Sequence, residues 1–128
     1  MRSQRAYLLH VLRCIDRIKE DSAAGHAAVL QSLTLQDAIL RNLQLLCEST
    51  QRLSPELKRA HPEIDWRAIT GMRNVLVHDY FEVDFGTVWR IVERDLPALE
   101  RAVTRALDEL GEPDLFAGRG PSSKPDDQ

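Results

Sequence analysis

The sequence predicts an all-α protein: a bundle of four main amphipathic helices with one additional short helix and a disordered C-terminal tail. Apolar residues recur at spacings of three and four in four stretches, and no stretch alternates polar and apolar residues as a strand would. The 128 residues suffice for one domain. We place this domain at 1–112, followed by a flexible tail at 113–128 that is rich in Pro, Gly, Ser and Asp.

The first helix is expected over roughly residues 2–20. Leu8, Val11 and Ile15 share one face there, and charged residues fill the opposite face. Residues 23–32 break this pattern and form either a loop or a short helix.

A second long helix is expected to begin near Leu35, because Thr34 and Asp37 resemble a capping box with an acidic residue in the third position. Ser54 and Pro55 then supply an N-cap and a first helical residue for a short helix.

The third helix has the clearest start. Asp65 is a good N-cap, and Ile64 before it can pack on Ile69 as a hydrophobic staple. This helix is expected from Trp66 to about Asp79.

The fourth helix repeats this arrangement, with Asp84 as the N-cap and Phe85 as the first residue. It is expected to end at Gly111, a typical helix terminator. Pro97 lies inside it and should kink it, because proline cannot donate to the carbonyl of Glu93.

The composition predicts a cytoplasmic protein. No apolar run exceeds four residues, so no transmembrane helix is expected. The start of the chain lacks the apolar region of a signal peptide. Cys14 and Cys47 form neither a CxxC motif nor a disulfide framework, and we expect both to be buried.

The charge is unevenly distributed. Residues 1–61 carry nine Lys and Arg against six Asp and Glu, whereas residues 62–128 carry eight against fourteen. A general nucleic-acid binder would be basic throughout, because phosphate contacts supply most of the non-specific affinity. The mildly positive first half could steer RNA toward one face, although solvated helix faces explain the same charges.

Polar side chains crowd the end of the third helix, within residues 71–80. Asn74 and His78 are four positions apart and share a helical face. Arg73 and His78 are five apart, which separates them by about 140° around an ideal helix and roughly 7.5 Å along it. They converge on one ligand only through long side chains, a distorted helix end or a second copy of the motif. A two-fold dimer supplies such a copy.

Arginine with histidine, and no metal-ligand cluster, suits phosphodiester chemistry. Histidine moves a proton near neutral pH, and arginine presents a fork of donors to phosphate oxygens. In RNA the neighbouring 2′-hydroxyl is the nucleophile, so the protein need not supply one. A structural alternative also fits: Arg73 pairs with Asp79 or a neighbouring helix, and His78 only ends the helix, where its charge suits the helix dipole.

The string Arg73-x-x-x-x-His78-x-Tyr80 resembles the RX4HXY signature of HEPN-domain proteins. The wider run at 66–81, WRAITGMRNVLVHDYF, looks like the HepT branch of these proteins (the DUF86 family). So do the runs VWRIVERDLP at 88–97 and DAILRNL at 37–43. The resemblance covers roughly residues 5–107 and implies a HEPN-type four-helix bundle.

The resemblance also implies a function, that of the toxin of a type VII-like toxin–antitoxin pair. Such proteins are dimeric, metal-independent endoribonucleases that need no cofactor and leave a 2′,3′-cyclic phosphate. If these positions have the roles of the matching motif residues in the family, Arg73 stabilises the transition state and His78 shuttles the proton. Asn74 and Asp79 are supporting residues.

The implied partner is an MntA-like minimal nucleotidyltransferase that acts as the antitoxin. It would transfer AMP from ATP onto the motif tyrosine, Tyr80. The added group would fill the cleft and place a phosphate against Arg73, which blocks RNA by bulk and charge. The alternative for Tyr80 is a side chain that only fills the core.

A rival function belongs to a different class. A non-catalytic HEPN module would bind a nucleotidyltransferase and regulate it, and the acidic second half of the chain is compatible with that. The complete motif favours the enzyme, because a scaffold does not need this set of residues.

Other residues have simpler interpretations. Gly71 inside a helix indicates close approach of another helix, which dimer packing would supply. Arg41 and Asn42 are candidates for the cleft lining, although the sequence does not place them there. Three further histidines are expected to be surface or capping residues: His10, His26 and His61.

Overall fold

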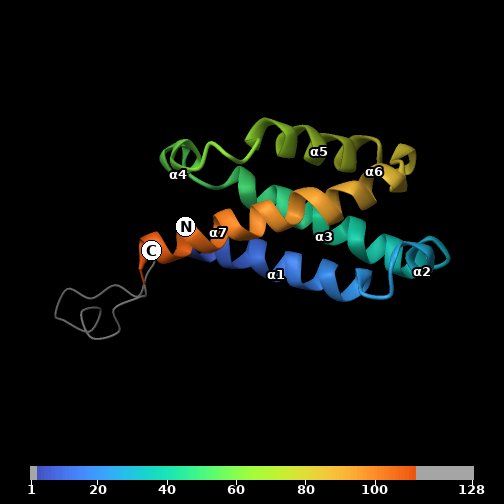
Figure 1. Ribbon diagram of the computed structural model, residues 1–128. Coiled ribbons are helices and arrows are strands. Elements are labelled where there is room, and N and C mark those ends of the chain that lie inside the picture. The colour runs from blue at the N-terminus through green and yellow to red at the C-terminus, as the bar shows by residue number, and fades with distance from the viewer. Residues whose placement is uncertain (1–2, 112–128) are drawn as a thin grey trace.

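The computed structural model describes residues 3–111, and all of its regular structure is helical (Figure 1). The long elements are α1 (Gln4–Ser22), α3 (Leu33–Gln51), α5 (Trp66–His78), and a continuous run of α6 (Phe85–Arg90), a π-helical turn (Ile91–Asp95) and α7 (Leu96–Leu110). Shorter elements are α2 (His26–Leu30), α4 (Pro55–Ala60) and the 3-10 turn η1 (Tyr80–Glu82). The described residues contain no strand, which confirms the all-α class. The tail predicted at 113–128 lies outside them.

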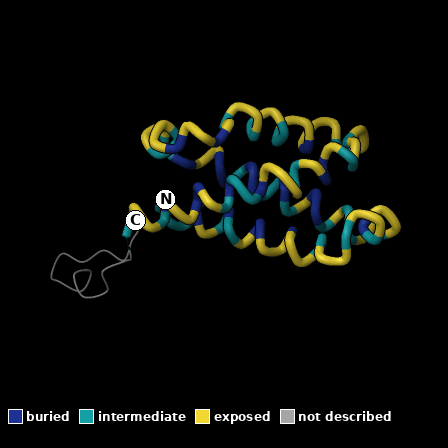
Figure 2. The backbone as a smooth tube through the Cα atoms, in the orientation of Figure 1, coloured by how far each residue is buried: buried dark blue, intermediate teal, exposed yellow. Residues whose placement is uncertain are grey.

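The core forms where α1, α3 and α7 pack together (Figure 2). Each helix turns one apolar stripe inward, because its apolar residues recur at spacings of three and four. The buried side chains include Leu8, Val11, Ile15 and Ile18 of α1, Ile39, Leu43 and Leu46 of α3, and Leu99 and Val103 of α7. Helix α5 packs along α3, at the edge of the bundle.

The start of α3 differs from the prediction. The Ser32 hydroxyl accepts a hydrogen bond from the backbone N–H of Leu35 at 3.1 Å, so Ser32 is the N-cap and the helix begins one residue later. The predicted capping box was therefore wrong: Thr34 already lies within the first turn. The carboxylate of Asp37 contacts the Tyr80 hydroxyl instead.

Three further predicted helix starts, those of α4, α5 and α6, are confirmed. Ser54, Asp65 and Asp84 cap α4, α5 and α6, and each side chain accepts a backbone N–H two or three residues further on. These bonds satisfy donors that the first helical turn leaves without partners.

Pro97 disturbs its helix in a specific way. Directly before it, the helix widens into the π-helical turn, where the N–H of Leu96 donates to the carbonyl of Ile91, five residues earlier. The predicted disruption takes this form because the helix rearranges its bonds around the missing proline donor. The helix ends as predicted at Gly111, whose φ is +75°.

The connection from α4 to α5 is fastened to the end of α7. His61 is only 4% exposed; its Nδ1 lies 3.5 Å from the Glu63 carboxylate and its Nε2 3.3 Å from that of Glu109. Arg105 of α7 also contacts Glu63. His61 is the C-cap of α4, as one of the predicted alternatives had it, but it is buried by these contacts and does not lie on the surface.

The start of α3 gives a direct test. Ser32→Ala should lower the free energy of unfolding by about 1 kcal/mol, because it leaves a helix N–H without its cap. Thr34→Ala is the matched control and should change it by less than about 0.5 kcal/mol. Urea denaturation measures both. A larger loss for Thr34→Ala than for Ser32→Ala would restore the capping box.

Candidate active site

Helix α5 runs antiparallel to α3, and a side-chain hydrogen bond marks each end of their contact. Near the end of α3, Gln51 Nε2 donates to the Thr70 hydroxyl at 2.9 Å. At the other end, the Tyr80 hydroxyl donates to Oδ1 of Asp37 at 3.3 Å. Because α5 is held at both ends, it keeps one rotation about its axis. The direction of each motif side chain then follows from helical spacing.

Arg73 lies near α3 and is half-buried. Its charge acts on the Cys47 thiol of α3: burial and the nearby Glu48 raise the pKa of Cys47 to about 12, and Arg73 opposes that rise. Its Nη1 donates to the side-chain oxygen of Asn74 at 3.3 Å. Its Nε is buried and has no hydrogen-bond partner within residues 3–111. The groups of the described residues thus use only part of a guanidinium that could bind phosphate oxygens.

His78 lies on a different side of α5 from Arg73, as their five-residue spacing predicts. The His78 and Asn74 side chains are exposed, and no hydrogen bond or ion pair holds the His78 ring within the described part of the chain. Asp79 ends α5, and its N–H donates to the carbonyl of Val75 at 2.8 Å. The structure therefore joins Arg73 to Asn74 by a hydrogen bond and leaves His78 on the exposed side of α5, without a hydrogen bond to either residue.

One half of the structural alternative for the arginine, pairing with Asp79, is not observed. Arg73 contacts Asn74, and no ion pair joins it to an acidic residue among residues 3–111, although its half-buried side chain lies near α3.

Tyr80 is half-buried in η1 and packs against the core. Its ring lies edge-on to Phe81, which is 96% exposed. Burial raises the pKa of the Tyr80 phenol, and the negative charge of Asp37 raises it further. The phenol is therefore un-ionised at neutral pH, and it donates to Asp37 until the pH rises above the usual tyrosine range.

The contact of Asp37 with the motif tyrosine is one that the sequence interpretation missed. The acidic position of Asp37, one turn into α3, was assigned to a helix cap. Nothing local in the sequence indicates a contact with a tyrosine 43 positions later.

The other candidates do not join the motif. Arg41 is exposed, and Asn42 donates to the Ala38 carbonyl of its own helix at 3.0 Å. His10 and His26 have structural contacts: His10 Nδ1 lies 2.5 Å from the Ser49 hydroxyl, and His26, which is exposed, stacks on the Trp89 ring.

The described residues offer neither a metal-binding cluster nor a membrane-spanning helix. No group of three or more His, Cys, Asp or Glu side chains there could hold a metal ion. No helix among them is long and apolar enough to cross a membrane.

Comparison with known protein families shows to which family this chain belongs. Residues 11–106 match the family described as "Ribonuclease HepT-like". The match runs from α1 into α7 and includes the whole motif. The chain belongs to this family.

Relatives of this HepT-like chain differ in length. A Thermococcus cleftensis protein named "Probable ribonuclease HepT" is 34% identical over 100 residues, covering 77% of this chain and 91% of that protein. "mRNA nuclease HepT" of Shewanella oneidensis is 26% identical over 117 residues, covering 73% and 87%. A Methanocaldococcus jannaschii protein, whose name joins a gamma-glutamylcyclotransferase to an RNase assignment, is 31% identical over 107 residues. That match covers 83% of this chain but only 48%, about half, of the longer protein. No solved structure gave a significant match.

The contact between Asp37 and Tyr80 gives a testable result in the HepT-like chain. Asp37→Asn should lower the pKa of Tyr80, because it removes a negative charge while keeping a hydrogen-bond acceptor. Absorbance titration of the phenolate, in a Tyr7→Phe background, measures Tyr80 alone, since the chain has two tyrosines. Glu48→Gln, which removes another carboxylate from α3, is the matched control and should leave the Tyr80 titration unchanged. An equal shift in both variants would contradict the contact.

Proposed function

We propose that this HepT-like chain is a metal-independent endoribonuclease and the toxin of a type VII-like toxin–antitoxin pair, acting as a homodimer in the cytoplasm. The family match and the two relatives named as HepT nucleases support RNA as the substrate. The catalytic assignment depends on one observation. The fold gives few hydrogen-bond partners to the two motif residues that suit phosphodiester chemistry. His78 is exposed, and the Arg73 guanidinium is only partly satisfied.

In the proposed reaction, the 2′-hydroxyl of RNA attacks the adjacent phosphorus. The new 2′-oxygen–phosphorus bond forms as the bond to the 5′-oxygen breaks, which leaves a 2′,3′-cyclic phosphate and a 5′-hydroxyl. His78 takes the proton of the 2′-hydroxyl and delivers one to the departing 5′-oxygen. Arg73 stabilises the charge that develops on the phosphorus oxygens. Asn74 orients the guanidinium through their 3.3 Å hydrogen bond, and Asp79 supports the helix end.

The proposed cleft takes Arg73 from one copy and His78 from the other, because the two side chains leave α5 on different sides. Gly71, Asn74, Val75 and His78 form an exposed stripe along α5, at spacings of three and four. A Cβ added at Gly71 would meet nothing within 4 Å, so a second helix can approach the backbone closely there. A two-fold contact along this stripe would bring both copies of the motif together.

The proposed antitoxin is an MntA-like minimal nucleotidyltransferase that modifies Tyr80. The phenol oxygen would attack the α-phosphorus of ATP, pyrophosphate would leave, and the phenol proton would be lost. The resulting ester oxygen has no proton to donate, so the hydrogen bond to Asp37 must break. The added anionic group, close to the motif, would exclude RNA by bulk and charge.

Removing the His78 ring tests the activity. Total RNA is incubated in EDTA with the chain, which intact mass has shown to carry no AMP. His78→Ala should slow cleavage by about 10²–10⁴-fold, the range for losing a general acid–base group. His26→Ala, which removes an exposed histidine from α2, should cleave like the wild type and leave cyclic phosphate ends. If the wild type and His78→Ala both leave RNA intact and bind a nucleotidyltransferase equally well, the chain is the non-catalytic regulatory module.

A substitution at Gly71 tests the proposed dimer. Gly71→Gln should weaken self-association and RNA cleavage together, because it places a long side chain in the proposed helix contact. The free energy of unfolding of the monomer should stay the same or rise by up to about 1 kcal/mol, since glycine is a poor helix former. Light scattering measures association, and Ala60→Gln, on an exposed face of α4, is the control. An unchanged dimer in Gly71→Gln would place the interface elsewhere.

A further inference from the structure

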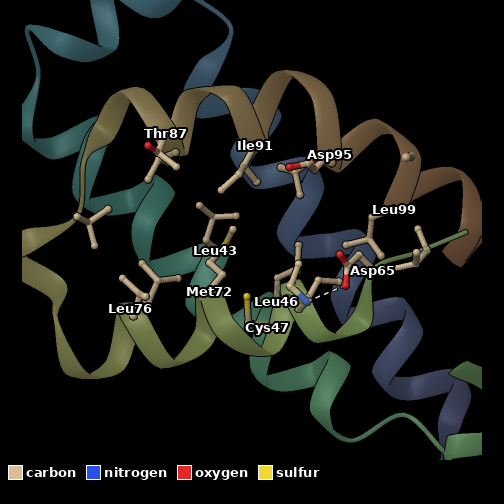
Figure 3. A pocket seen from close by; sticks show the side chains of 18 of the residues that line it. Leu43, Leu46, Cys47, Asp65, Met72, Leu76, Thr87, Ile91, Asp95 and Leu99 are labelled. Carbon is tan, nitrogen blue, oxygen red and sulfur yellow. Dashed lines mark hydrogen bonds between the residues drawn. The ribbon is translucent and has the colours of Figure 1, made fainter. Parts of the chain in front are cut away.

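An apolar groove separates α5 from the run of α6 to α7 (Figure 3). It exists because α5 packs along α3 but scarcely approaches α7. The cavity volume is about 650 Å³. Leu43, Leu46 and Cys47 of α3 form its floor, Met72 and Leu76 of α5 line one wall, and Ile91 and Leu99 line the other. The groove adjoins the exposed stripe of α5 at Val75, which belongs to both, and His78 does not line it.

The charges around this groove all have one sign. Among residues 3–111, five carboxylates line it and no Lys, Arg or His does. Glu63 and Asp65 lie at the start of α5, Glu82 and Asp84 at the opposite end, and Asp95 along the other wall. Within the part of the chain that the structure describes, only Glu63 of these five has a cationic partner, in Arg105 and His61. The groove therefore presents an apolar surface with an acidic rim.

This charge excludes two occupants. RNA phosphates would be repelled by the rim. A second copy of the chain, placed groove against groove, would set the five carboxylates of one copy against those of the other, and like charges facing each other across an interface are costly. An occupant of opposite charge fits instead.

The shape of the groove defines that occupant further. The 13 residues of α5 make a wall about 20 Å long, at a rise of about 1.5 Å per residue. A helix of three to four turns would fill this length, with apolar residues against the floor and basic residues against the rim. We propose that the groove is a docking site for a basic amphipathic helix of a protein partner.

Designed peptides test the proposal without knowledge of the partner. The probe is a fluorescein-labelled helical peptide of about 14 residues, long enough to span the groove, with Leu on one face and Lys on the other. Its fluorescence anisotropy with the full chain should show saturable binding that weakens as salt is added. A peptide with the same Leu face and Glu in place of Lys should bind at least about tenfold more weakly. No binding of the Lys peptide, or equal binding of both, overturns the proposal.

Two charge-reversal pairs locate the binding. Glu82→Lys with Asp95→Lys reverses two exposed rim charges, neither of which accepts a helix-capping hydrogen bond. Glu93→Lys with Asp108→Lys makes the same change in net charge at exposed positions outside the groove. The first pair should weaken binding of the Lys peptide about tenfold more than the second.

Equal effects of the two pairs would mean that the peptide responds only to the overall charge, and the groove would not be a site. The mass of each variant in solution is measured in parallel. A change of oligomeric mass in the rim pair alone would make a second copy the occupant, which also overturns the proposal.

Discussion

The packing of α5 on α3 is the constraint on which the candidate site depends. The 13 residues of α5 present three sides, each of which has different surroundings. Thr70 and Arg73 lie toward α3, Met72 and Leu76 line the groove, and Asn74 and His78 face solvent. Successive residues of a helix are about 100° apart, so a rotation of α5 by one residue would exchange these sides. The hydrogen bonds of Gln51 and Asp37 across the pair oppose such a rotation.

This division separates two kinds of surface on one helix. The groove side is apolar with an acidic rim, which suits a basic protein segment and repels RNA. The two remaining sides of α5, together the motif side, carry Arg73 and His78, whose side chains suit a phosphate group. Tyr80 lies just beyond the end of the helix, where Asp37 holds its hydroxyl. A group added to Tyr80 would therefore change the motif side first.

Local signals in the sequence were sufficient for most of the fold. The caps at Ser54, Asp65 and Asp84 were predictable because each depends on a few adjacent residues. The start of α3 was not, because two hydroxyl residues, Ser32 and Thr34, compete for one cap. Contacts between distant positions, such as Asp37 with Tyr80 and His61 with Glu109, depend on how helices pack and leave no local pattern. The groove is absent from the sequence prediction for the same reason.

Mixing two inactive variants tests most directly whether one cleft takes Arg73 from one copy and His78 from the other. Arg73→Ala and His78→Ala chains are combined, allowed to exchange subunits, and assayed for RNA cleavage in EDTA. We predict recovery of about a quarter of the wild-type activity, because half of the dimers are mixed and each of these has one complete cleft of two. If mass measurement shows that mixed dimers form and the mixture is as inactive as either variant alone, the shared cleft is contradicted.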